Sequence, residues 1–110
     1  MKPSAKPLTR TGGLWRQGDV FIIPTDQLPS DLSAHRPVLA EGEVTGHAHR
    51  LANPKAGQVF RGKSGLFLKV HAAEATIEHE EHGPVTVPQG NYIVRIQREY
   101  HPREIRRVID

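Results

Sequence analysis

Two pairs of histidines are the residues of this 110-residue chain whose types and spacing could do chemistry. One residue separates His47 from His49, and two residues separate His79 from His82. Side chains two positions apart in a strand point to the same face, so His47 and His49 are expected to face one space. Imidazole nitrogens that converge in this way can hold a transition metal. The spacing therefore predicts a metal centre with nitrogen ligands.

Side chains alternate between the two faces of a strand, so apolar residues two positions from a histidine indicate whether that histidine faces the interior. Leu51 shares a face with the first histidine pair, and Ile77 shares one with the first member of the second pair. If these apolar residues pack in the core, those histidines point inward as well. His82 lies beyond an expected corner, where parity does not fix its direction. The predicted metal ligands are His47, His49 and His79, with His82 as the alternate third ligand.

Three imidazoles would leave coordination positions open for water, dioxygen or substrate. Intrinsic affinity favours copper at such a site, with zinc, iron and nickel as alternatives. The absence of a carboxylate ligand departs from the facial triad of non-haem iron oxygenases, which leaves copper or zinc as the better fit. Copper could cycle between two oxidation states and activate dioxygen or peroxide, whereas zinc would only polarise substrate or water.

Two further residues are candidates for catalytic support. Glu43 shares the strand parity of the first histidine pair, and Tyr92 follows the segment Pro88–Gly90. Either side chain could orient an imidazole or handle a proton, and core packing is the more ordinary role for Tyr92. The remaining histidines lie in loop-like or strand-end positions and are read as surface residues: His35, His71 and His101.

Composition sets the outer limits of the fold. Hydrophobic residues make up 36% of the chain and charged residues 25%, which suits one small domain with a modest core. The absence of cysteine excludes disulfides and thiolate ligands. No apolar run approaches the ~18 residues of a membrane span, so no membrane partner is expected. The first residues lack a secretory signal, which indicates a cytoplasmic protein or a secreted mature form.

Strand-like segments are many, and helix-like patterns are few. Short apolar runs are separated by glycine and proline, which is typical of an all-β sandwich or barrel. Residues 1–13 are predicted as a flexible arm before one β domain, 14–110, in which 25–36 form a loop and 88–91 a turn. The predicted strands are 18–24, 37–40, 43–51, 58–61, 66–70, 75–79, 84–87, 92–100 and 104–109.

Two motifs resemble those of cupins. Gly46–His49 resembles the HxH half of the first cupin motif, and Gly83–Gly90 resembles the glycine–PxG turn of the second. The chain lacks the glutamate that usually follows the HxH pair, and Ile93 stands where a histidine usually follows the PxG glycine. The resemblance implies a small single-domain jelly roll, or double-stranded β-helix, with one metal inside. The third nitrogen would then come from His79 or His82.

Longer stretches, 41–51 and 79–100, are similar to a family of very short bacterial cupin-like proteins that includes copper enzymes cleaving cellulose by oxidation. This similarity implies a homodimer with a mononuclear copper held by histidines and a polysaccharide substrate. The function expected from the sequence is therefore a mononuclear metal enzyme, with copper favoured, that carries out oxidative chemistry on cellulose or a related polysaccharide.

A function of another class is suggested by the C-terminal region. Its last sixteen residues are rich in arginine, at Arg95, Arg98, Arg103, Arg106 and Arg107. The alternative is a non-catalytic, metal-stabilised β module that binds a partner or nucleic acid through this strand. Nucleic acid is the less favoured partner, because the chain has only one tryptophan, two tyrosines and three phenylalanines for base stacking.

Overall fold

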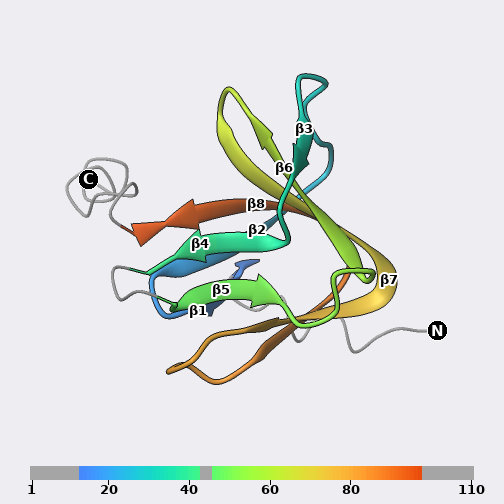
Figure 1. Ribbon diagram of the computed structural model, residues 1–110. Helices are drawn as coiled ribbons and strands as arrows, with labels where there is room; N and C mark the ends of the chain where they lie inside the picture. Colours follow the sequence, from blue (N-terminus) through green and yellow to red (C-terminus); the bar gives the residue numbers. More distant parts are fainter. Residues whose placement is uncertain (1–12, 43–45, 98–110) are drawn as a thin grey trace, which may run out of the picture.

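The computed structural model describes residues 13–42 and 46–97 and shows an all-β protein. Eight antiparallel strands form one sheet that folds into a jelly-roll-like β sandwich (Figure 1). The all-β prediction is thus confirmed. The strands are β1 (Trp15–Gln17), β2 (Val20–Thr25), β3 (Ser33–His35), β4 (Val38–Glu41), β5 (Ala48–Leu51), β6 (Gly57–Gly62), β7 (Gly65–Glu78) and β8 (Val85–Ile96).

The two long strands, β7 and β8, each take part in both layers. The first half of β7 pairs with β6 and with the second half of β8, whereas its second half pairs with β5 and with the first half of β8. β1 and β2 extend the first layer beside β8, and β4 extends the second layer beside β5. β3 adds to the outer side of β6. The tip that joins β7 to β8 therefore lies at the end of the second layer, close to β5 (Figure 1).

The sequence predicted interruptions between strands at 71–74 and 88–91. In the structure both segments are bends within continuous strands, β7 and β8. The register of β7 against β8 shifts between Val70 and Glu74, opposite the segment Pro88–Gly90. A strand that passes from one layer to the other must bend, and a β-bulge supplies the bend while it tolerates proline. The predicted turn at 88–91 is therefore wrong, and the segment that resembles the cupin PxG turn lies inside β8.

Three strand boundaries also differ from the prediction. β2 continues through Pro24, whose missing N–H is tolerated because β1 pairs with β2 only from Val20 to Ile22. β3 lies inside the predicted loop 25–36, where its three residues pair with β6. β5 begins only at Ala48, after Gly46 turns the chain at a φ of 88°. His47 therefore precedes the strand rather than lying within it.

The core lies between the layers and is built from alternate residues of the strands. In β5 the buried residues alternate with half-buried ones, so His49 and Leu51 face inward, as parity predicted. Cross-strand burial of this kind holds the sheet layers together. The largest fully buried side chains are Ile22, Leu39, Leu68, Ile77, Val20, Val59, Val70 and Val87.

Some expectations fall outside the described residues. These are the arm up to residue 12, the end of the strand predicted at 92–100, and the strand predicted at 104–109. Within the described ranges, 13–42 and 46–97, no helix is long and apolar enough to cross a membrane.

Candidate metal centre

Four imidazoles gather where the β7–β8 tip meets the start of β5. The ring centroid of His79 lies 4.2 Å from that of His49, 4.8 Å from that of His82 and 5.8 Å from that of His47. The centroids of His49 and His82 are 6.0 Å apart. The structure thus brings together all four histidines predicted as ligands, with His79 touching each of the others.

His49 is the buried member of this histidine cluster, which we define as His47, His49, His79 and His82. Only 4% of its surface is exposed, and its Nδ1 lies 2.8 Å from Oε1 of Gln17. The amide of Gln17 donates through Nε2 to the carbonyls of Ile77 and Gly83, each at 2.9 Å. Two carbonyl acceptors fix the amide's orientation, so the atom facing His49 is an oxygen.

The orientation of Gln17 determines the tautomer of His49. An oxygen facing Nδ1 requires the proton on Nδ1, which leaves the lone pair on Nε2. Metal-binding histidines commonly donate their second ring N–H to a carbonyl or carboxylate in this manner. Burial, together with the neighbouring His79, also lowers the pKa of His49 to about 4, so its ring is neutral at pH 7. His49 is therefore held in a form that can ligate a metal.

Asp19 and His82 approach His49 from the β1–β2 turn and the β7–β8 tip. Oδ1 of Asp19 lies 3.8 Å from Nε2 of His49, too far for a hydrogen bond but compatible with two ligands of one ion. His82 packs over Gly18, where an added Cβ would lie 2.6 Å from its Nε2. Gly18 also has a φ of 59°, a conformation that favours glycine. The turn thus needs glycine for the close approach of the ring.

The outer side of the cluster contains a group of three possible donors. One donor atom from each of His47, His79 and Glu80 falls within 4.8 Å of the other two. Nδ1 of His79 accepts a hydrogen bond of 3.0 Å from the N–H of Glu81, so the neutral ring carries its proton on Nε2. An ion bound at Nδ1 would take the place of that hydrogen bond. Oε2 of Glu81 lies 3.4 Å from Nδ1 of His47.

Glu80 fastens the β7–β8 tip to β5. Its carboxylate accepts the N–H of Ala48 at 3.0 Å and pairs with the guanidinium of Arg50. These hydrogen bonds lower the pKa of Glu80 to about 2. These contacts of Glu80 hold His79 beside the first histidine pair, because Glu80 directly follows His79 in the chain.

A family model described as a domain of unknown function, DUF8820, matches residues 16–97. The chain belongs to this family. No curated protein and no solved structure matches the chain. The DUF8820 match spans all eight strands but for the first residue of β1, and it includes the whole histidine cluster.

The other residues predicted to support the site have different places in the DUF8820 fold. Tyr92 packs in the core, with its ring edge-on to Trp15 at 5.7 Å and its hydroxyl donating to the carbonyl of Pro88 at 2.5 Å. These contacts match its ordinary packing role. Glu43 lies outside the described residues. Among the histidines read as surface residues, His71 is exposed and His35 half-buried, whereas His101 lies outside the described residues.

Three functional candidates of this DUF8820 chain were not found from the sequence. Glu80 stands beside His79 in the string His79–His82, so a signal was present but was read only as an acidic corner. The contacts of Gln17 and Asp19 with His49 could not be predicted from local sequence, because about thirty residues separate each of them from His49 in the chain. Only the fold shows that β1 and the β1–β2 turn line the site.

Metal-free protein should lose stability as the pH falls from about 6.5 to about 4. The folded-state pKa of His49, about 4, lies below the ordinary value of 6.5, so the unfolded chain binds this proton first. His79, His82, Asp19 and Glu80 face the ring, and burial outweighs the attraction of the two carboxylates. The stability present above pH 6.5 should decrease by on the order of 2 kcal/mol across this window.

Urea unfolding in EDTA at several pH values measures this decrease. His49→Gln should flatten the curve between pH 6.5 and 4. The loss from pH 4.5 down to about 2, where Glu80 takes up its proton in the unfolded chain before it does so in the folded protein, should remain. An equal slope in both proteins would show that His49 is not held neutral by its surroundings.

Proposed function

We propose that the histidine cluster binds one transition-metal ion, with copper favoured, and that the protein uses it for oxidative chemistry. The observation that carries the proposal is the buried His49, whose Nε2 lone pair is fixed by Gln17 within a group of four imidazoles. Four imidazole rings gathered so closely would repel one another if they were protonated. Binding one ion would keep them neutral and use their lone pairs.

The ring separations around His79 are within the span of one ion. With metal–nitrogen bonds of about 2.0–2.1 Å, two donor atoms on one ion lie at most about 4.2 Å apart, and two ring centroids lie at most about 6.4 Å apart. The separations of His79 from each other ring and of His49 from His82 are 4.2–6.0 Å. Three donors around one tetrahedral ion lie about 3.4 Å apart, so the donor atoms of His47, His79 and Glu80, within 4.8 Å of one another, would close by up to about 1.4 Å on binding.

The nearby carboxylates modify the all-imidazole site expected from the sequence. Glu80 already serves the N–H of Ala48 and the guanidinium of Arg50, so using it as a ligand would cost those contacts. Asp19 makes no such competing pair with a cation among the described residues. Mixed nitrogen and oxygen donors still follow the affinity order that places copper above zinc, iron and nickel.

A bound copper ion would supply one-electron exchange with dioxygen or peroxide. The residues around the cluster leave it open to a large substrate. Glu81 and His82 are exposed, so one side of the cluster faces solvent. Glu81 is placed to accept a proton from Nδ1 of His47.

Cellulose or a related polysaccharide is the favoured substrate because of the resemblance to short cupin-like copper proteins. Trp15, packed against Tyr92, is only half-exposed for sugar stacking.

Metal titration followed by activity assays tests the proposal. We expect one copper ion per chain by calorimetry and elemental analysis, and nitrogen coupling in the electron paramagnetic resonance spectrum. With ascorbate and peroxide, the copper-loaded protein should release oxidised oligosaccharides from cellulose. No copper binding would overturn the metal centre. Tight binding without any oxidation would instead support the non-catalytic, metal-stabilised module.

The arginine-rich strand and the homodimer stay predictions. Of the five C-terminal arginines only Arg95 lies in the described part of the chain, on β8. Salt-dependent nucleic-acid binding that is lost on replacing Arg106 and Arg107 would favour the alternative function.

A further inference from the structure

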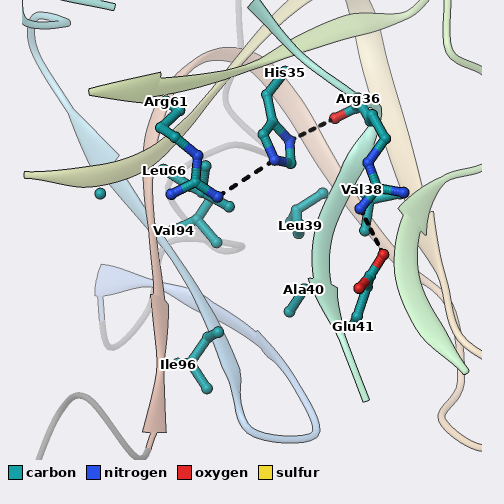
Figure 2. A pocket seen from close by; sticks show the side chains of 11 residues that line it. His35, Arg36, Val38, Leu39, Ala40, Glu41, Arg61, Leu66, Val94 and Ile96 are labelled. Carbon is teal, nitrogen blue, oxygen red and sulfur yellow. Dashed lines mark hydrogen bonds and ion pairs between the residues drawn. The ribbon is translucent and has the colours of Figure 1, made fainter. Parts of the chain in front are cut away.

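A second cavity lies apart from the histidine cluster, between β4 and the strands of the first layer. Its volume is about 340 Å³, at the lower end of the roughly 300–1,000 Å³ of small-molecule sites. Figure 2 shows apolar side chains around the open space, with Arg61, His35 and Arg36 along its upper margin and Glu41 below Arg36. The apolar lining consists of Val38, Leu39, Ala40, Leu66, Val94 and Ile96. No member of the histidine cluster lines it.

Two arginines of this cavity differ in their partners. Arg36 forms an ion pair of 2.5 Å with Glu41, and both residues line the cavity. Arg61 has no carboxylate within ion-pair distance among residues 13–42 and 46–97. The cavity lining therefore carries one positive charge, that of Arg61, which the described residues do not neutralise.

His35 lies beside Arg61 and does not neutralise its charge. Nδ1 of His35 lies 3.0 Å from the carbonyl of Arg36, which can only accept, so Nδ1 carries the proton. Nε2 then presents a lone pair to Nη2 of Arg61, 3.5 Å away (Figure 2). A neutral imidazole occupies at most one of the five N–H donors of the guanidinium, which leaves the others for a ligand.

We infer that this cavity binds a small organic carboxylate. The planar fork of Arg61 matches a carboxylate, which it can bind through two hydrogen bonds. The partly exposed members of the apolar lining, Val38, Leu66 and Ile96, offer a surface for a short hydrocarbon or aromatic body. A ligand therefore needs both parts: inorganic phosphate lacks the apolar body, and a neutral alcohol lacks the charge. The inference does not depend on the proposed metal centre.

Benzoate binding to the full-length chain tests the inference, after metal ions have been removed with EDTA and the EDTA, itself a carboxylate, has been dialysed away. Methyl NMR spectra should show shifts at Leu39, Leu66, Val94 and Ile96. Benzyl alcohol and inorganic phosphate should each bind roughly tenfold more weakly than benzoate, since loss of a charged hydrogen-bond pair costs about that factor.

Variants of Arg61 separate this cavity from general attraction of anions to a basic protein. Arg61→Gln should weaken benzoate binding roughly tenfold or more, and Arg61→Lys should weaken it less because the charge is kept. The matched control is Lys63→Gln, which removes an exposed cation outside the cavity and should leave binding unchanged. Absence of benzoate binding, equal binding by Arg61→Gln, or shifts confined to other residues would overturn the inference.

Discussion

His79→Ala is expected to lower the copper affinity of this DUF8820 protein by at least about 100-fold, the upper end of the loss seen when only a supporting residue is removed. His79 is the one histidine within 5.8 Å, centroid to centroid, of all three others in the cluster. It also belongs to the group of three donors that lie within 4.8 Å of one another. Its removal should therefore cost a ligand and also separate His47 from the buried side of the site.

Competition with a chromophoric copper chelator measures this loss. His71→Ala is the matched control, because His71 is an exposed histidine of β7 outside the cluster. We expect control and wild-type protein to bind copper equally, and thermal melts in EDTA to show that both variants fold. His82→Ala should have the smaller effect of the two tip histidines, since His82 is exposed and contacts fewer rings. An unchanged affinity in His79→Ala would contradict the proposed centre.

The inward direction of His49 could be predicted because it follows from local geometry. Side chains alternate along a strand, and Leu51 marks the inner face two residues after His49. The same reasoning favoured His79 through Ile77, which is fully buried at the end of β7. In both cases the direction of a side chain depends on residues two positions away, so a single sequence contains enough information.

The ends of strands were harder to predict, because they depend on pairing between distant segments. Pro88 and Gly90 are turn residues by local preference, yet they lie within β8 because the β7 bulge bends both strands together. His47 was placed on a strand that begins one residue later, after the turn at Gly46. Local propensity is a weak guide where tertiary pairing decides whether a segment bends or ends.

This difference bears on the resemblance to cupins. The HxH pair spans the start of β5, with His47 before the strand and the buried His49 within it. The second motif keeps its residues but not the expected turn, because Pro88–Gly90 lies within β8. The second pair of histidines lies instead on the tip that precedes β8. The cupin-like metal centre therefore stays a proposal that rests on the histidine cluster rather than on the second motif.

Gln17→Leu should lower both the stability of the protein and its copper affinity. Gln17 is 2% exposed and makes three hydrogen bonds, to the carbonyls of Ile77 and Gly83 and to His49. Leucine has a similar size but leaves these buried groups without their partner. We expect a loss of about 2–4 kcal/mol in the free energy of unfolding, because buried polar groups without partners cost about 1–3 kcal/mol each.

The effect on copper separates a positioning role for Gln17 from a purely structural one. Without the amide oxygen, nothing fixes the proton of His49 on Nδ1, so we expect copper affinity to fall about 10–100-fold. Gln58→Leu is the matched control: its amide donates to the carbonyls of His35 and Val59, away from the cluster. It should lower stability and leave copper affinity unchanged. If Gln17→Leu gives the same pattern as Gln58→Leu, then His49 is a structural core residue, and the metal would have to bind through the other three histidines alone.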